Sequence, residues 1–383
     1  MSRSLFLFST LVLLAFNPDI SLGQQHNSIH NPEKGAWQDF DTKPITYNLV
    51  QVFGKEFDDK NTNSVPFSEG KKIWGVDTDE DGNVYALDVN IPRLVKFSPK
   101  GELLWQIDQR GRGPGDLEYA YSLAVSDSVF ITNIRGTRVD IFSKNGVYIK
   151  SVALNGFEGS FDFTIIGTID NDYLVLKAAI LGKIGARIVI LDIKNNFSVG
   201  SDFTFTEETN VPFPSNWNVL NQSTIIDNYI VITSYLSYKM YYYDIEGKLV
   251  KEVSREFPEY KRPGIYISRG EGFHVTLIGD IGGHRKIDDK YLINYITWTE
   301  NVDDDDAMDK FAKDIFNGDY PDRTYKNSID LYSYEGKLLY SEEGEGLTPT
   351  IGKIRHIDHE GFLYTVTSDP FPQIKKYEVC INE

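Results

Sequence analysis

The strongest constraint on the fold is a phrase that recurs six times along the chain. In each copy a short β-rich run ends in an aromatic or aliphatic residue, and a polar turn, usually with glycine, precedes a second β-rich run. The residues that end the first run are Phe97, Phe142, Leu191, Tyr243, Tyr332 and Tyr377. Successive anchors lie 45, 49, 52, 89 and 45 residues apart. A recurring spacing of this kind indicates a repeat architecture.

A second hairpin signal precedes the anchors. Residues 74–88 are an example, in which alternating β-formers flank a turn rich in Asp and Gly. This pattern is typical of half-buried strands joined by tight turns. Two hairpins per period give four strands, and four strands in about 45 residues are typical of a propeller blade. We therefore predict an all-β fold, a six-bladed β-propeller with four-stranded antiparallel blades. A β-sandwich would explain the strands but not the period.

The two ends of the repeat region predict how the ring closes. The last repeat stops soon after Tyr377 and lacks an outermost strand, while the β-rich segment 45–53 has no blade of its own. An incomplete blade would leave strand edges open. We expect the N-terminal strand to complete the last blade, so that residues 45–383 form one propeller domain.

The N-terminal segment predicts export. Residues 1–23 have the pattern of a signal peptide, with a basic start at Arg3, an apolar run at 5–16 and small residues before position 24. The run is too short to span a bilayer, and no Cys follows it to carry a lipid. We expect a periplasmic or secreted protein that is not lipid-anchored, with residues 24–44 as a polar lead-in.

One motif carries a resemblance to a known family. The run Gly111-Arg-Gly-Pro-Gly-Asp-Leu117, together with the Asp-x-x-Gly-x-Val-Tyr hairpin of the repeat, resembles the NHL and TolB-like six-bladed propellers of exported bacterial proteins. The resemblance covers about residues 45–383 and is strongest in the first two blades. The third to fifth blades lack the Gly-Pro-Gly turn. The resemblance implies the propeller fold, and its members mostly bind proteins, peptides or sugars, with a minority of lyases and hydrolases.

Charge and cysteine content exclude some classes of protein. The chain has 39 Lys plus Arg against 56 Asp plus Glu, a net charge of −17. This balance argues against a nucleic-acid partner, which requires a basic footprint. The single Cys380 excludes an internal disulfide and a cysteine-based zinc site. No segment after the signal is apolar enough to span a membrane, and we expect a monomer.

Two insertions are expected on one face of the propeller. With strands named A to D from the central channel outward, the B–C loops and the D-to-A crossings share a face, which we call the loop face. Residues 254–283 fall in a crossing and residues 299–327 in a B–C loop. Apolar residues from Met308 to Phe316 follow helical spacing, with Asp305 or Asp306 as N-cap and Gly318 as terminator. This helix either packs on the blade edge or forms a lid over the channel.

The arginines indicate what the loop face binds. Every arginine after the signal except Arg355 falls in or close to a B–C loop or a D-to-A crossing, whereas acidic residues fill the A–B turns. Guanidinium groups bind carboxylates, sulfates and phosphates through paired hydrogen bonds. We predict that the loop face binds an anionic ligand, such as an acidic glycan or peptide carboxylates. The candidate ligand-binding residues are Arg93, Arg112, Arg135, Arg138, Arg187, Arg285 and Arg323. An alternative for Arg93, Arg138 and Arg187 is to bond neighbouring blades, since each precedes an anchor by four residues.

Catalysis on the same face is an alternative. His274 and His284 lie in or beside the first insertion, next to Arg285. A histidine base and an arginine that neutralises a uronate would suit a lyase acting on acidic polysaccharide by β-elimination. A protein-interaction scaffold is the second alternative, so the sequence leaves open whether the protein is an enzyme.

A metal site is the weakest of the candidate sites. Asp77, Asp79 and Asp81 match part of a calcium-binding loop. The expected hairpin, however, carries Asp88 to the far end of the returning strand, away from the other carboxylates. We expect no cofactor, with a looser calcium site on the three aspartates as the alternative.

Overall fold

The computed structural model of the chain describes most of the repeat region. The described residues are 26–54, 67, 73–180, 185–206, 221–234, 236–261, 264–268, 272–276, 280–300, 302, 304–317, 324–346 and 348–382. The predicted signal peptide, Arg323 and Gly318 lie outside them. Among the described residues, no helix is long and apolar enough to cross a membrane.

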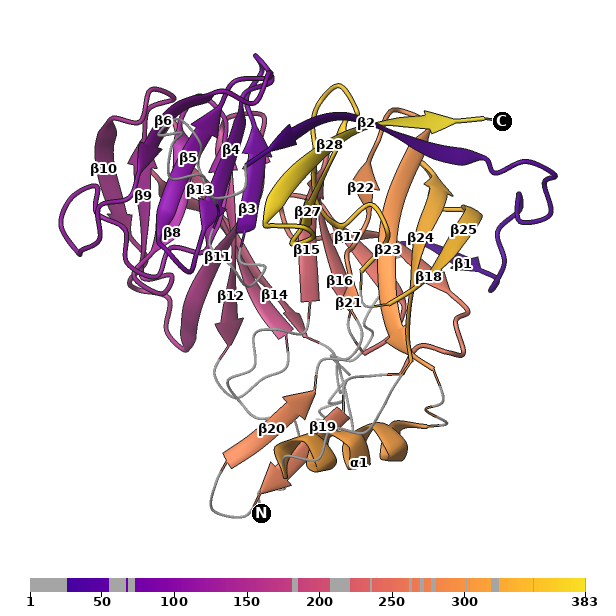
Figure 1. Cartoon of the computed structure of the whole chain (residues 1–383). Helices are drawn as coiled ribbons and strands as arrows, with labels where there is room; N and C mark the ends of the chain where they lie inside the picture. The colour runs from indigo at the N-terminus through magenta and orange to yellow at the C-terminus, as the bar shows by residue number, and fades with distance from the viewer. Residues whose placement is uncertain are drawn as a thin grey trace, which may run out of the picture.

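The protein is a six-bladed β-propeller (Figure 1). Blade 1 is β3 (Ile73–Thr78), β4 (Val84–Asp88), β5 (Arg93–Phe97) and β6 (Leu103–Ile107). Blade 2 is β7 (Ser122–Val125), β8 (Val129–Asn133), β9 (Arg138–Phe142) and β10 (Tyr148–Ala153). Blade 3 is β11 (Ser160–Ile169), β12 (Tyr173–Ile180), β13 (Gly185–Asp192) and β14 (Ser198–Thr206).

The second half of the ring repeats this plan. Blade 4 is β15 (Asn221–Ile226), β16 (Tyr229–Ser234), β17 (Lys239–Tyr243) and β18 (Leu249–Arg255). Blade 5 has a divided inner strand and is β21 (Asp280–Ile281), β22 (Arg285–Lys286), β23 (Tyr291–Thr299), β24 (Tyr325–Ser333) and β25 (Leu338–Glu345). Blade 6 is β26 (Lys353–Ile357), β27 (Leu363–Thr367), β28 (Gln373–Ile381) and β2 (Ile45–Phe53). The inner strands contact one another in the order β3, β7, β11, β15, β22, β26 and back to β3, which closes the ring.

Each anchor of the sequence repeat lies beside a β-bulge. In blade 1, Phe97 pairs with Leu103 while Lys96 pairs with Trp105, so one residue of β6 has no partner. The same shift occurs between the third and fourth strands of every blade. The bulged residues are Val50, Leu104, Ile149, Gly200, Val250 and Leu339. A bulge twists the outer strand and blunts its edge against pairing with another chain. The sequence repeat therefore corresponds to a repeated backbone feature, a β-bulge beside each anchor.

The predicted closure of the ring is confirmed. Strand β2 pairs antiparallel with β28 over its full length, from Ile45 opposite Ile381 to Phe53 opposite Ile374. The Phe53 ring is buried between the ring of Phe97 in blade 1, 5.9 Å away, and that of Tyr364 in blade 6, 6.4 Å away. The N-terminal strand thus fills the seam between the first and last blades.

The segment expected to be a polar lead-in contributes a strand of its own. Strand β1 (Asn27–Asn31) adds in parallel to the outer edge of β18. The buried Asn31 side chain donates to the Gly336 carbonyl at 2.9 Å and accepts from the Leu338 amide at 2.8 Å. The Trp37 amide then donates to the Leu339 carbonyl at 2.7 Å. The segment before β2 therefore runs along the outer wall of blades 4 and 5.

The two insertions pack against each other. The hairpin of β19 (Gly264–Ser268) and β20 (Gly272–Thr276) contacts helix α1 (Asp305–Phe316), and Figure 1 shows the three elements projecting together from the propeller. The N-cap differs from the prediction, because Asp304 accepts the Ala307 amide at 2.9 Å. Met308, Phe311 and Ala312 are buried, as the helical spacing predicted.

Candidate functional site

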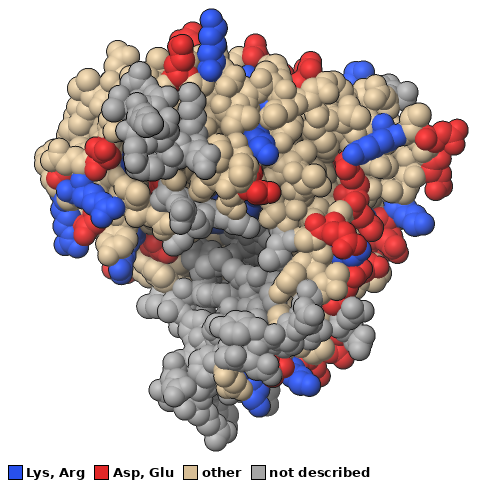
Figure 2. All heavy atoms as spheres, in the orientation of Figure 1, with Lys and Arg blue, Asp and Glu red and all other residues tan. Residues whose placement is uncertain are grey.

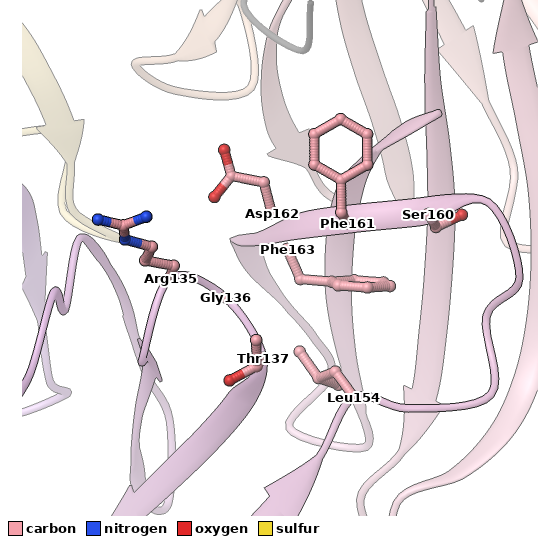
Figure 3. A pocket seen from close by; sticks show the side chains of 8 residues that line it. All are labelled: Arg135, Gly136, Thr137, Leu154, Ser160, Phe161, Asp162 and Phe163. Carbon is pink, nitrogen blue, oxygen red and sulfur yellow. The ribbon is translucent and has the colours of Figure 1, made fainter. Parts of the chain in front are cut away.

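A pocket of about 360 Å³ lies on the loop face, where blade 2 meets blade 3. Its lining comes from the β8–β9 connection, the end of β10 and the start of β11, which are a B–C loop, a D-to-A crossing and an inner strand. The lining residues are Arg135, Gly136, Thr137, Leu154, Ser160, Phe161, Asp162 and Phe163 (Figure 3). Of the arginines predicted to bind a ligand, Arg135 is the one that lines this pocket.

Four non-glycine residues at or beside the pocket have unusual backbone conformations. Tyr119, Ile134, Arg135 and Asp162 have φ values of 52°, 49°, 54° and 59°, in the left-handed region. The other non-glycine residues in this region among the described ones belong to turns on the opposite face: Asp170, Asn171, Asn196, Phe197 and Asp227. A β-branched residue such as Ile134 is particularly costly in this conformation. Such conformations persist only where the surrounding structure imposes them, and they cluster at functional sites.

Gly136 allows the β8–β9 connection to approach β11. Its φ is 69°, and a Cβ atom there would collide with the Tyr121 hydroxyl and the Phe163 backbone. The Tyr121 hydroxyl donates to the Phe163 carbonyl at 3.1 Å and to Asp162 Oδ1 at 2.5 Å. Burial, and then the hydrogen bond to the Asp162 carboxylate, raise the pKa of Tyr121 above its usual value. Tyr121 therefore remains protonated and holds the start of β11 in place.

Arg135 presents a charged group that the described residues do not neutralise. Its guanidinium carbon lies 4.7 Å from the centre of the Tyr119 ring. Tyr119 is 53% exposed. Within the described part of the chain, Arg135 forms no hydrogen bond or ion pair. Stacking on an aromatic ring orients a guanidinium while its N–H donors stay available for a ligand.

Arg138 makes its bonds within the protein. It forms an ion pair with the buried Asp140 at 2.9 Å. It also donates to the carbonyls of Arg112 and Gly113 at 3.0 and 3.1 Å. These bonds hold the Gly-Pro-Gly turn of residues 111–117 against blade 2. The motif that carries the family resemblance is thus stabilised by an arginine of the repeat.

The other candidate arginines within the described ranges have protein partners. Arg112 pairs with Glu118, and its side chain is exposed. Arg187 pairs with Asp202 and lies over the Phe157 ring at 5.2 Å. Arg285 donates to the Gly282 carbonyl at 2.6 Å. Arg93 is half-buried at the start of β5 and also interacts with other residues of the protein. Arg323 lies outside the described residues.

His284, the one candidate histidine whose side chain lies in the described part of the chain, is buried and does not form an accessible site with Arg285. His284 is fully buried between blades 4 and 5, with Nδ1 2.5 Å from the Tyr242 hydroxyl and its ring 4.5 Å from that of Tyr332. Burial, and secondarily the charge of Lys251, lower the pKa of His284 well below its usual value. A catalytic role would require this packed contact to open. His274 lies in β20, and its side chain lies outside the described part of the chain.

Two of the three aspartates considered for calcium, Asp77 and Asp79, have separate partners. The buried Asp79 accepts from the Tyr85 hydroxyl at 2.9 Å and pairs with Lys96 at 3.1 Å. Asp77 instead accepts the Val125 amide at 2.8 Å, which links blade 1 to blade 2. The residues that the structure describes contain no group of three or more His, Cys, Asp or Glu able to hold a metal.

The surroundings of Asp79 recur in blade 6. There the Tyr364 hydroxyl donates to Asp358 at 2.9 Å, and Lys376 lies 3.5 Å from the same carboxylate. The Asp-Tyr-Lys group is therefore an element of the repeat that fixes the first hairpin of a blade. This recurrence assigns Asp79 to the stability of the fold.

The sequence prediction missed the residues that shape the pocket around Arg135. Tyr119, Tyr121, Phe161 and Asp162 belong to no recognisable motif. Only the loop position of Arg135 pointed to the site. Charged groups elsewhere are mixed in sign, and Figure 2 shows no extended basic patch among the described residues on the visible side.

Comparisons with known proteins support the fold. No protein-family model and no curated protein sequence matches the chain. A putative exported protein from Bacteroides fragilis is similar in structure, with a TM-score of 0.56, 10% identity, and coverage of 93% of this chain and 100% of the other. A member of the DUF4221 family from Bacteroides vulgatus has a TM-score of 0.54 at 10% identity, covering 88% and 99%. At this identity the likeness concerns the fold alone, and the NHL and TolB-like relationship remains a prediction.

Proposed function

We propose that the protein binds an anionic ligand through the pocket between blades 2 and 3, with Arg135 as the anchor. The observation that carries this proposal is the exposed guanidinium of Arg135, which is stacked on Tyr119 and uncommitted to the described residues. An unpaired guanidinium at the rim of a pocket donates readily to a carboxylate, and such charge-assisted bonds contribute about 1.5–3 kcal/mol. The ligand class is an acidic glycan or a peptide carboxylate.

Binding accounts for the pocket better than catalysis does. The described residues of its lining include no histidine or lysine, and the raised pKa of the adjacent Tyr121 makes that residue a poor base at neutral pH. Asp162 is the one carboxylate of the described lining, and it accepts a hydrogen bond from Tyr121, so we favour binding by Arg135 over proton removal from a uronate. The ligand screen described below would also detect the two alternatives, a lyase at this face and a protein-interaction scaffold.

Export remains part of the proposal. The predicted signal peptide supports it, and so does the similarity in fold to a putative exported protein. We propose a monomeric periplasmic or secreted binding protein without a cofactor.

The test combines a ligand screen with two arginine variants. Thermal shift and calorimetry would compare uronate-containing oligosaccharides, neutral oligosaccharides, and peptides with free or amidated carboxyl groups. We expect Arg135→Gln to weaken binding of the carboxylate ligands by about ten- to a hundredfold, which corresponds to the loss of one charged hydrogen bond or a bidentate pair. Arg112→Gln is the matched control, because that exposed arginine on the same face already pairs with Glu118.

Three results would contradict the proposal. Equal loss in the two variants would show that general charge, and not the pocket, attracts the ligand. Unsaturated products that absorb in the ultraviolet would show a lyase. A screen in which no small ligand stabilises the protein would favour the scaffold.

A further inference from the structure

We propose that a second pocket, on the face opposite the loop face, binds a small aromatic carboxylate, with Lys251 as its cation. This site is separate from the pocket that Arg135 lines, and the inference does not depend on the proposed function. The observation behind it is a lysine ammonium group that lies among tyrosine rings and forms no ion pair with the described residues.

The second pocket lies where blade 4 meets blade 5. Its lining comes from the β15–β16 turn, from β17 and β18, from the turn after β24, and from the added strand β1. The residues that matter for the argument are Ile226, Tyr229, Tyr242, Val250, Lys251 and Tyr334. The volume of about 280 Å³ is close to the lower limit of small-ligand pockets, which measure roughly 300–1,000 Å³. The pocket therefore suits a ligand with a single ring system.

Lys251 brings a positive charge into this pocket. Its Nζ lies 3.9 Å from the centre of the Tyr242 ring and 5.8 Å from that of the Tyr334 ring. Among the described residues, it donates one hydrogen bond, to the Tyr334 carbonyl at 3.4 Å. An ammonium group carries three N–H donors, so the remaining donors are available to a ligand.

The surroundings of Lys251 favour an anionic partner. Burial lowers the pKa of Lys251, and the charge of Glu335 opposes this effect only in part. Glu335 is exposed and hydrogen-bonds to Ser333, and it forms no ion pair with Lys251. A bound carboxylate would supply the partner that the protein does not, because an opposite charge nearby favours the protonated lysine. A cationic ligand would be repelled.

The tyrosine rings form walls at fixed positions. The Tyr334 hydroxyl donates to Asp227, and the hydroxyl of the buried Tyr242 hydrogen-bonds with His284. Tyr229 is 38% exposed, and its ring meets the Tyr242 ring edge-on, with 6.4 Å between the centres. These contacts orient the rings before a ligand arrives, which reduces the entropy lost on binding. Because aromatic rings gain from edge-on and offset contacts with one another, the walls favour an aromatic ligand over a saturated one.

Benzoate and two analogues are the probes for this inference. NMR titrations would compare benzoate with benzamide, which lacks the charge, and with cyclohexanecarboxylate, which lacks the aromatic ring. They would use the full chain with Arg135→Gln, so that the pocket between blades 2 and 3 does not add to the signal. We expect benzoate to bind about tenfold more tightly than benzamide, because of one charge-assisted hydrogen bond. It should bind about threefold more tightly than cyclohexanecarboxylate, because of contacts between aromatic rings.

Two pairs of further substitutions locate the ligand. Lys251→Met should weaken benzoate about tenfold and leave benzamide unchanged, because methionine keeps the apolar chain without the charge. Lys248→Met is the matched control, since that exposed lysine lies just before β18 and outside the lining. Tyr229→Leu should weaken benzoate about threefold, whereas Tyr229→Phe, which keeps the ring, should not.

Four results would overturn the inference. They are equal weakening by Lys251→Met and Lys248→Met, benzamide binding as tightly as benzoate, no binding of benzoate in the Arg135→Gln background, and equal affinities of Tyr229→Leu and Tyr229→Phe. The tyrosine pair decides the question even if Lys251→Met does not fold. None of these results bears on the proposed function, which is tested by the effect of Arg135→Gln alone on carboxylate ligands.

Discussion

The substitution Phe53→Ala should lower the free energy of unfolding by about 3–5 kcal/mol, which is the usual loss when alanine replaces a core phenylalanine. The loss would fall on the strand that closes the propeller. The side chain is 0% exposed. Its ring lies 5.9 Å from that of Phe97 and 6.4 Å from that of Tyr364, so the cavity left by Phe53→Ala would open between blade 1 and blade 6. Because β2 is the outer strand of blade 6 and comes from the other end of the chain, the loss acts on the seam that joins the two termini.

Urea unfolding followed by circular dichroism would measure this loss. With a slope of about 3 kcal/mol per molar urea, the midpoint should fall by roughly 1–1.7 M. Leu49→Ala is the control, because Leu49 lies on the same strand but is 54% exposed, and its loss should change stability by about 0.5 kcal/mol or less. Equal effects of the two substitutions would refute the account, since they would show that β2 does not bury Phe53 in the ring.

Three further predictions concern buried charge and the pocket. Arg255→Met should cost about 3–5 kcal/mol in urea unfolding, because it leaves Asp330, 2.8 Å away and buried, without its cation, and adding Asp330→Leu should recover part of the loss. Burial lowers the pKa of Lys177 to about 8, so the unfolded chain binds this proton more tightly than the folded protein does. Below pH 8, Lys177 therefore lowers the free energy of unfolding by up to about 3 kcal/mol. Lys177→Met should therefore stabilise the protein at pH 7 and by less as the pH approaches 10; an equal gain at both pH values would contradict this assignment. Gly136→Ala should abolish ligand binding because a Cβ there meets atoms of the pocket, whereas Gly156→Ala, where φ is also positive but the space is open, should retain it.

Much of the fold could be predicted from the sequence because its signals are local. β-formers on either side of an Asp-Gly turn specify a hairpin wherever they occur, and their recurrence at a nearly constant spacing specifies a blade. The missing outer strand near Tyr377 and the unassigned strand at 45–53 then left one way to close the ring. Strand β1 was missed because it pairs in parallel with an existing edge, and its short polar sequence, Asn27–Asn31, carries no strand pattern of its own.

The candidate site depended on tertiary structure. The sequence placed both Arg135 and Arg138 on the loop face as candidates, with the bonding of neighbouring blades as the alternative for Arg138. The fold distinguishes them, because Asp140 lies beside Arg138 and neutralises it, whereas Arg135 is turned by its positive φ toward Tyr119 and the solvent. Which charges are neutralised, and which are brought together across two blades, depends on contacts between segments distant in the sequence. Local patterns do not encode such contacts, and so the sequence alone determined the propeller while the packing of blade 2 against blade 3 decided where the pocket lies and that Arg135 lines it.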